Sequence, residues 1–358
     1  MTKYTLSDLG WSEQFARQLD DETQDLTPAR IYEVQRDLLL VLTETDQETG
    51  QETGQETGQN IGQKSLIPTE SAGEYAVGDW VLSDGVKAIH RLEPFSNLTR
   101  KAAGHVNYQQ RIAANIDTIA IVTSCNADFN VPRLERYLAM VSSAGAMPLV
   151  LLTKADRADD PRDYQRQAER ISPLVTAIAL NAKDQEDVAQ LIPWCRGGQT
   201  LALIGSSGVG KTTIRNSLTG ENAVTQDIRE DDARGRHTTT HRSLVPTPYG
   251  GWLIDTPGMR ELQLAGMEDG ISAVFEDIEQ LAIQCKFNDC EHGVEPGCAV
   301  RVAIESGELD EDRLTRWRKL LREDAINTES VARQRARGKA FSKMVKKTMA
   351  GSKKRKGR

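Results

Sequence analysis

A run of glycine, serine, lysine and threonine has the composition of a loop that binds phosphate. It fits the pattern G-x-x-x-x-G-K-[ST], and its members with the following residue are Gly205, Ser206, Ser207, Gly208, Val209, Gly210, Lys211, Thr212 and Thr213. Glycines let the backbone approach a phosphate closely, and the amides of such a loop form an anion-binding nest. In this pattern the Lys211 ammonium reaches the β- and γ-phosphates, and the Thr212 hydroxyl binds Mg²⁺.

The residues around this loop predict the elements that must hold it. The apolar run 200–204 predicts a buried strand, and residues 213–218 predict the start of a helix. Another short apolar run, 251–254, predicts a strand that ends at Asp255, the first residue of Asp-Thr-Pro-Gly. At a strand end beside a phosphate loop, Asp255 is placed for a water-mediated contact with Mg²⁺, and the Gly258 amide is placed to contact a γ-phosphate.

Two loops that precede the phosphate loop predict which base the nucleotide carries. The first, after an apolar run at 147–152, consists of Thr153, Lys154, Ala155 and Asp156. An ionised Asp156 accepts hydrogen bonds from N1–H and the exocyclic amine of guanine, a donor pair that adenine lacks, so GTP is predicted over ATP. The usual guanine motif begins with Asn, so the contact from Thr153 is expected to be weaker.

The second loop follows an apolar run at 175–180 and resembles the S-A-K loop that reads guanine O6 through a backbone amide. Its members are Asn181, Ala182 and Lys183. Between the phosphate loop and Asp255, residues 234–242 occupy the place of a first switch loop. One of its threonines could bind Mg²⁺, and His237 is the candidate for positioning the hydrolytic water. A solvated loop histidine is the alternative.

Along the chain these parts run base loop, second base loop, phosphate loop, first switch and second switch. That order is a circular permutation of the order in Ras-like GTPases. In this order and its motifs the sequence resembles the RsgA (YjeQ) family of circularly permuted GTPases of small ribosomal subunit biogenesis. The resemblance covers roughly residues 30 to 335 and also rests on residues 77–81, 110–117, 133–138, 235–240 and 255–261.

The resemblance implies a multidomain fold with three parts. These are an N-terminal OB-fold β-barrel, a central, circularly permuted α/β P-loop GTPase domain, and a mostly helical C-terminal zinc-binding domain. It also implies an enzyme that hydrolyses GTP to GDP and phosphate, is stimulated by the small ribosomal subunit, and couples hydrolysis to late maturation of that subunit. The expected partners are the subunit, its rRNA and other assembly factors, and we expect the protein to act as a monomer.

Two other functions stay open. One is an ATPase, which Asp156 disfavours because adenine lacks the donor pair that this carboxylate would accept. The other is a zinc-containing RNA-binding protein in which the nucleotide is mainly structural. Turnover measured with and without small ribosomal subunits would separate this second alternative from a GTPase.

Three cysteines and one histidine lie close together in the C-terminal part of the chain. Their spacing is C-x4-C-x-H-x5-C, and the residues are Cys285, Cys290, His292 and Cys298. Three thiolates and one imidazole form a closed tetrahedral set for Zn²⁺ with no open position, which predicts one structural zinc ion. The other two cysteines, Cys125 and Cys195, adjoin apolar runs and are expected to be packed thiols. No disulfide framework is indicated, as in a reducing compartment.

Composition and pattern divide the chain into five expected segments. They are an accessory segment of helical, polar character at 1–28, the barrel at 29–100, the GTPase domain at 101–265, the zinc-binding domain at 266–331 and a basic arm at 332–358. Strand-like runs at 31–34, 38–42 and 78–82 favour a small barrel. Within the barrel, the polar loop 47–63 holds three tandem Gln-Glu-Thr-Gly repeats and is expected to be disordered.

Charge is unevenly distributed along the chain. The net charge is −7, yet residues 332–358 hold twelve Lys or Arg and no acid, which leaves −19 for the rest. A basic arm on an acidic body predicts contact between the arm and RNA phosphates, with a solubilising tail as the alternative. There is no apolar run long enough to span a bilayer and no signal-peptide pattern, so we expect a soluble cytoplasmic protein with no membrane partner.

Overall fold

The computed structural model of the chain describes residues 4–44, 63–101, 109–220, 242–255 and 266–328. The chain divides into two compact units, residues 1–99 with 111–261 and residues 100–110 with 262–358. Five predictions lie outside the described residues: the roles of His237, Gly258 and a switch-loop threonine, the tandem repeats and the basic arm. The boundaries of the five expected segments stay a prediction.

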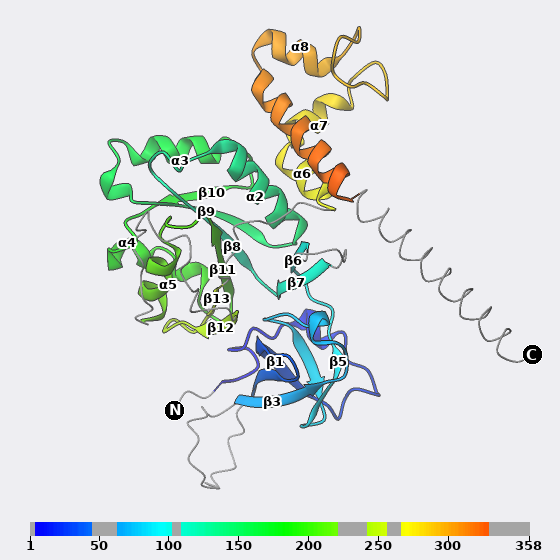
Figure 1. Cartoon of the computed structure of the whole chain (residues 1–358), viewed down its shortest axis with the longest axis vertical. Coiled ribbons are helices and arrows are strands. Elements are labelled where there is room, and N and C mark those ends of the chain that lie inside the picture. Colours follow the sequence, from blue (N-terminus) through cyan, green and yellow to red (C-terminus); the bar gives the residue numbers. More distant parts are fainter. Residues whose placement is uncertain (1–3, 45–62, 102–108, 221–241, 256–265, 329–358) are drawn as a thin grey trace, which may run out of the picture. The chain divides into compact units, whose positions relative to one another are not determined.

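Five strands of the first unit form a closed barrel, in which β1, β3 and β5 are labelled in Figure 1. β1 (Thr27–Val34) pairs antiparallel with β2 (Leu39–Thr43) and with β4 (Trp80–Ser83). β3 (Gln63–Pro68) pairs antiparallel with β2 and parallel with β5 (Lys87–Arg91), and β5 returns to β4. The ring of hydrogen bonds therefore closes, and the strands predicted at 31–34, 38–42 and 78–82 are confirmed.

Apolar side chains that alternate along these strands fill the barrel. Because successive residues of a strand point to opposite faces, every second position of β1 and β2 faces inward. The interior is formed by Ala29, Ile31, Leu39, Val41, Leu66, Tyr75, Val81 and Ala88. A short 3-10 helix, η1 (Ala72–Glu74), leads into β4.

The segment before the barrel differs from the helical, polar segment expected. Its only helix in the described part is α1 (Glu13–Ala16), and the remaining residues up to Leu26 form mainly turns. The turns arise because Asp and Thr side chains bond to nearby backbone, as when Asp20 accepts a hydrogen bond from the Thr23 amide at 3.1 Å. Phe15 is fully buried, with its ring 5.8 Å from that of Trp80, so this segment packs against the barrel.

Beyond the barrel, the sheet continues through six strands in the order β10-β9-β8-β11-β13-β12. The first five are parallel and β12 is antiparallel. Their bounds are β8 Thr118–Ser124, β9 Met147–Thr153, β10 Thr176–Ala179, β11 Thr200–Gly205, β12 Ser243–Pro246 and β13 Trp252–Asp255. The strands predicted from the four apolar runs are confirmed to within two residues.

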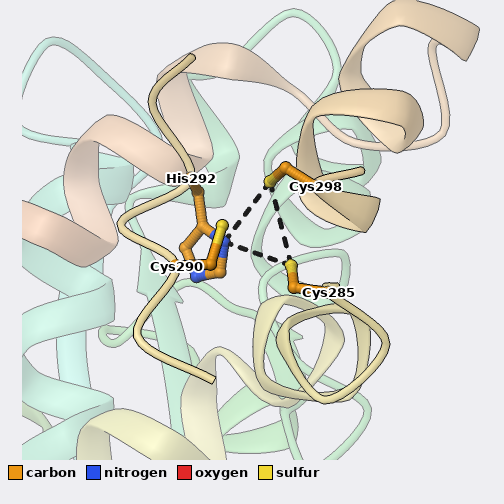
Figure 2. A group of neighbouring side chains, drawn as sticks. All are labelled: Cys285, Cys290, His292 and Cys298. Carbon is orange, nitrogen blue, oxygen red and sulfur yellow. Dashed lines mark hydrogen bonds between the residues drawn. The ribbon is translucent and has the colours of Figure 1, made fainter. Parts of the chain in front are cut away.

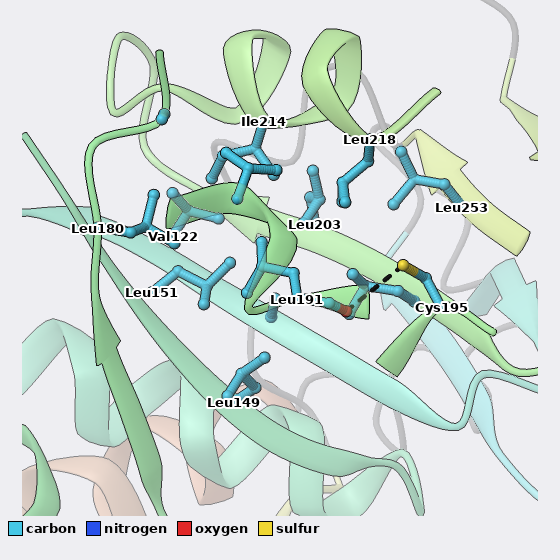
Figure 3. Close-up of a cluster of buried hydrophobic side chains, with 14 of the residues drawn as sticks. Val122, Leu149, Leu151, Leu180, Leu191, Cys195, Leu203, Ile214, Leu218 and Leu253 are labelled. Atoms are coloured by element: carbon cyan, nitrogen blue, oxygen red, sulfur yellow. Dashed lines mark hydrogen bonds between the residues drawn. The ribbon is translucent and has the colours of Figure 1, made fainter. Parts of the chain in front are cut away.

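Helices cover both faces of this sheet. Their bounds are α2 Val131–Ser143, α3 Pro161–Glu169, α4 Gln185–Ala189 and α5 Lys211–Thr219, with the 3-10 helices η2 Ala155–Arg157 and η3 Ile192–Trp194. Side chains of α5 pack onto one face, where Ile214 and Leu218 meet Val122, Leu203 and Leu253 of the strands (Figure 3). This buried cluster fixes the start of α5 relative to the end of β11.

A two-stranded sheet, β6 (Asn97–Lys101) with β7 (Gln109–Ala114), connects the barrel to the six-stranded sheet along the chain. Arg111 of β7 forms a bidentate ion pair with the fully buried Asp79, in which each guanidinium NH group lies 2.8 Å from a carboxylate oxygen. Both charges are thus paired inside the first unit, as burial of an ion pair requires.

The second unit is mostly helical. Its elements are α6 (Glu268–Val274), α7 (Glu276–Ala282) and α8 (Ala299–Ser306), and residues 311–328 are also helical. Its core is formed by Ile271, Phe275, Ile278, Val300 and Leu314, all fully buried. In the described part of the whole chain, no helix combines the length and apolar character needed to cross a bilayer.

Candidate functional site

The predicted phosphate loop joins the end of β11 to the start of α5. Gly210 is the N-terminal cap of α5 with φ +102°, and Gly208 has φ +76°, values that side chains disfavour. The Lys211 ammonium donates a hydrogen bond to the Gly205 carbonyl at 2.8 Å and another to the Ser206 carbonyl. The lysine therefore lies along the loop at a helix N-terminus, the arrangement that holds anions.

Residues of the phosphate loop differ in their exposure to solvent. Ser207, Gly208 and Thr212 are exposed, whereas Val209 is buried, with 1% of its surface accessible. The loop is thus anchored by Val209 in the core below α5 and turns its glycine and hydroxyl groups to solvent. A nucleotide arriving from solvent would meet these groups first.

The first base loop lies against the phosphate loop. Thr153 ends β9, and its hydroxyl lies 2.5 Å from the Val209 carbonyl and 3.0 Å from the Thr123 carbonyl. Lys154 follows in a left-handed conformation with φ +58°, which turns the chain into η2. Asp156, in η2, is exposed, with Arg157 Nε 3.8 Å from its carboxylate. The carboxylate that is expected to read guanine is therefore accessible.

The second base loop lies beside the first base loop and the helix that follows the phosphate loop. The Ala155 amide donates to the carbonyl of Leu180, just before this loop, at 3.3 Å. Asn181 accepts a hydrogen bond from the Lys183 amide through Oδ1 at 3.1 Å, and Ser217 of α5 donates to the Ala182 carbonyl at 3.2 Å. The structure thus brings both base loops together with the phosphate loop, although they precede it in the chain.

The sheet topology explains why the two base loops lie beside the phosphate loop. Parallel strands end at the same edge of a sheet, and ligands of open α/β sheets bind at that edge. β9, β10, β11 and β13 are all parallel and end respectively at the first base loop, the second base loop, the phosphate loop and Asp255. Reversing the chain order of the loops does not move them, because their place is set by the strands.

The two predicted Mg²⁺ ligands belong to adjacent elements. β13 pairs with β11, where Asp255 is the register partner of Leu203, two residues before Gly205. Thr212 is exposed in the first turn of α5. A hydroxyl and a carboxylate are the hard oxygen ligands that Mg²⁺ prefers, so the types of these residues fit the ion.

A residue of α2 that the motifs did not single out also contacts the loop. The side chain of Tyr137 is 9% exposed and lies near Ser206, whose side chain acts to lower the pKa of the phenol. Burial raises the pKa of Tyr137, so the phenol stays protonated at neutral pH. The segment 133–138 supported the family resemblance, but nothing in its residue types indicated a partner in the phosphate loop.

The four predicted zinc ligands form one cluster in the second unit (Figure 2). The Sγ atoms of Cys285 and Cys298 are 3.8 Å apart, and each lies 3.5 Å from Nδ1 of His292. In a tetrahedral zinc centre with ordinary bond lengths, two sulfurs are about 3.8 Å apart and a sulfur and a nitrogen about 3.5 Å. With Cys290, all ligand atoms lie within 4.8 Å of one another, so the cluster fits Zn²⁺.

Residues around the cluster favour the metal-binding forms of His292 and Cys285. Burial and then the charge of Arg318 lower the pKa of His292, which favours the neutral imidazole that binds metals. Arg301 Nε donates to the His292 carbonyl at 2.9 Å, which holds this residue in its left-handed conformation, φ +59°. Burial alone would raise the pKa of Cys285, but hydrogen bonds with the Val300 and Ala299 amides and with the side chains of Cys298 and Cys290 together lower it.

The remaining cysteines are packed thiols, as predicted. Cys125 and Cys195 are both buried, and burial raises the pKa of each to about 11. Cys195 belongs to the cluster beneath α5 and its thiol contacts the Leu191 carbonyl at 3.4 Å (Figure 3). Neither thiol has the lowered pKa of a reactive cysteine.

This geometry defines a circularly permuted P-loop GTPase that carries a barrel before it and a Cys/His cluster after it. A sequence model of the RsgA GTPase family matches residues 92–265. A small ribosomal subunit biogenesis GTPase RsgA of Mesorhizobium japonicum is 47% identical over 338 residues, covering 90% of this chain and 91% of that protein. RsgA 2 of Vibrio parahaemolyticus is 44% identical over 357 residues, covering 99% and 95%. The chain belongs to the RsgA family of GTPases.

Solved structures show the same fold at lower sequence identity. YloQ, described as a circularly permuted GTPase, aligns with a TM-score of 0.57 at 22% identity over 85% of this chain and 97% of its own. YjeQ from Thermotoga maritima aligns with a TM-score of 0.56 at 20% identity over 83% and 98%. The predicted fold class is therefore confirmed: an N-terminal barrel, a central permuted GTPase domain and a C-terminal helical region with the Cys/His cluster.

Proposed function

We propose that this GTPase acts in biogenesis of the small ribosomal subunit, by binding the subunit and coupling GTP hydrolysis to its late maturation. The observation that carries the proposal is the contact between Thr153 and Val209, which seats a guanine-type loop against a phosphate loop. Relatives that are 44% and 47% identical over most of their length carry the name small ribosomal subunit biogenesis GTPase.

The nucleotide would bind at the carboxyl edge of the sheet. Asp156 would accept hydrogen bonds from guanine N1–H and the exocyclic amine, and the amides after Asn181 would face guanine O6. The amides of residues 206–213 and the Lys211 ammonium would hold the phosphates, with the Gly258 amide near the γ-phosphate. These contacts favour a triphosphate of guanosine over one of adenosine.

Hydrolysis would need a metal ion and an oriented water molecule. Thr212 and Asp255 would hold Mg²⁺, which neutralises phosphate charge as it develops. His237 is the proposed water-positioning group, and replacing it with alanine should lower stimulated turnover by about 100-fold. The zinc ion held by the Cys/His cluster would be structural, because its four protein ligands leave no position open.

Contacts with the subunit would be made to its rRNA and to neighbouring assembly factors. The basic arm 332–358 would add attraction for phosphate, which the acidic remainder of the chain cannot supply. We place the protein in the cytoplasm, where ribosomal subunits are assembled, and we propose that it acts as a monomer.

GTP turnover by the full chain, with and without purified small subunits, tests this function. We expect stimulation by the subunit in the wild type, loss of turnover in Lys211→Ala, and weaker, more salt-sensitive stimulation after deletion of residues 332–358. Equal turnover with and without subunits would contradict the proposal and favour an RNA-binding protein in which the nucleotide is structural.

A further inference from the structure

The hydroxyl of Thr153 is committed to backbone acceptors. The side chain is 1% exposed, and both oxygens near it, of Val209 at 2.5 Å and Thr123 at 3.0 Å, are carbonyls. A carbonyl oxygen only accepts, so the single hydroxyl proton must serve these two groups, and the shorter contact receives it. Thr153 is therefore a donor to the phosphate loop.

The peptide whose carbonyl Thr153 contacts is flanked by glycines. Val209 lies between Gly208 and Gly210, both with positive φ, and glycines restrict rotation of the neighbouring peptide planes least. In a planar trans peptide the C=O and the following N–H point in opposite directions. Holding the Val209 carbonyl toward β9 therefore aims the Gly210 amide away from β9.

Packing supports the same contact. A Cβ placed on Gly210 would lie 3.5 Å from Cγ2 and 3.6 Å from Oγ1 of Thr153, so this side chain is the neighbour that an added carbon at Gly210 would contact. The branched side chain of threonine thus lies next to Gly210 while its hydroxyl reaches the Val209 carbonyl. Serine keeps the hydroxyl and valine keeps the shape, which allows the two contributions to be separated.

We propose that Thr153 is a positioning residue for the phosphate loop and not a base-contacting residue. It orients the Val209–Gly210 peptide, and through it an amide that binds the nucleotide phosphates. This inference rests on the proposed function, since it requires GTP to bind at this loop. It replaces the expectation of a weakened base contact from Thr153 with a defined role in phosphate binding.

Contact with the base and positioning of the phosphate loop predict different effects of the base on nucleotide affinity when the Thr153 hydroxyl is removed. A hydroxyl that read guanine would donate to an acceptor on the base edge, N7 or O6. Removing such a hydroxyl would weaken GTP but would have less effect on 7-deaza-GTP, which lacks N7, or on a base altered at O6. Removing a hydroxyl that orients the phosphate loop would weaken all of these nucleotides by the same factor.

Dissociation constants of GTP, 7-deaza-GTP and 6-thio-GTP for the full chain test the proposal. We expect Thr153→Val to weaken all three about tenfold and equally, because a buried carbonyl loses its donor. Thr153→Ser should stay within about twofold of the wild type for the same reason. Thr118→Val is the matched control, because it removes a buried hydroxyl at the first residue of β8, at the end of that strand away from Thr123. It should leave the dissociation constants of all three nucleotides unchanged.

The other possible binding results would overturn the proposal or the proposed function. Unchanged binding by Thr153→Val, with or without a lower melting temperature, would overturn the proposal and leave the hydroxyl a structural role. A loss for GTP that is smaller for 7-deaza-GTP or 6-thio-GTP would overturn it in favour of base contact. If Thr153→Val does not fold, Thr153→Ala compared with Thr153→Ser decides in the same way. Absence of GTP binding by the wild type would instead contradict the proposed function.

Discussion

Arg30 of the barrel strand β1 donates a hydrogen bond of 2.7 Å to Oγ1 of Thr200, the first residue of the strand that ends in the phosphate loop. The same guanidinium donates to the carbonyls of Leu9 at 2.6 Å and Asn115 at 3.1 Å. It is 1% exposed, and burial lowers its pKa to about 10, so it remains charged at neutral pH. The barrel and the GTPase sheet therefore share one buried cationic group.

Replacing Arg30 with methionine should destabilise the first unit by about 3 kcal/mol, because three buried acceptors lose a charged donor. The shift of the urea midpoint, followed by tryptophan fluorescence, measures this. Arg17→Met is the matched control, since Arg17 forms an exposed ion pair with Glu13 at 2.7 Å and its loss should change stability by about 0.5 kcal/mol or less. Equal effects of the two substitutions would contradict this role of Arg30.

Gly205, at the start of the phosphate loop, should not tolerate alanine. Its φ is +139°, and a Cβ there would lie 2.1 Å from the carbonyl oxygen of Val122 in β8, a backbone atom that cannot move aside. Gly85→Ala is the control, because φ is +94° but nothing lies within 4 Å of the added carbon. We expect about 1–2 kcal/mol of destabilisation for Gly85→Ala from conformation alone.

The same urea titration should give a clearly larger loss for Gly205→Ala, together with loss of GTP binding. A Gly205→Ala variant as stable as Gly85→Ala would show that β8 and β11 can separate without cost. The close pairing of these two strands would then not be what positions the phosphate loop.

The local parts of this molecule could be predicted from sequence, and the contacts between distant parts could not. Strands β9 and β11 are apolar runs that end in recognisable loops, and the zinc ligands are close in sequence, so pattern alone found them. The partner of the Thr153 hydroxyl is a backbone carbonyl 56 residues away, and every residue type carries such a carbonyl. Arg30 meets Thr200 across 170 residues for a similar reason, and no sequence pattern marks either contact.

In the N-terminal segment, the sequence pattern does not predict the observed structure. Its polar residues were expected to line a helix, but Asp and Thr there bond to nearby backbone and favour turns, as Asp8 does with the Thr5 amide at 2.9 Å. The buried side chains of Leu9 and Phe15 decide where the segment lies. Their neighbours in the barrel come from distant parts of the chain, so periodicity within the segment could not reveal them.

Removal of metal should unfold the Cys/His part of the second unit. We expect one zinc ion per chain, released by a chelator together with loss of helical circular dichroism. Cys290→Ser should lower the zinc content, whereas Cys125→Ser, at a buried thiol outside the cluster, should retain it. Full helicity without zinc, or equal zinc content in both variants, would contradict a structural metal.

Alkylation should separate the two classes of cysteine. Because burial raises the pKa of Cys125 and Cys195 to about 11, about one thiol in a thousand is ionised at pH 8. We expect iodoacetamide to modify neither residue in the folded protein and both after unfolding, with the sites located by mass spectrometry. After chelation, the three cysteines of the cluster should become reactive while Cys125 and Cys195 stay protected, because loss of the metal unfolds only the Cys/His part. Rapid modification of Cys195 in the folded chain would contradict its burial.

The central claim is that a base loop and a phosphate loop in reversed order form one guanine-nucleotide site, and the specificity of Asp156→Asn tests it most directly. The measurement is kcat/KM for GTP and XTP in the wild type and in this variant, with small subunits present. An amide accepts one hydrogen bond fewer from guanine and can donate to the xanthine oxygen, so GTP should lose about 10- to 100-fold while XTP gains. Unchanged kcat/KM for GTP in the variant would contradict the account.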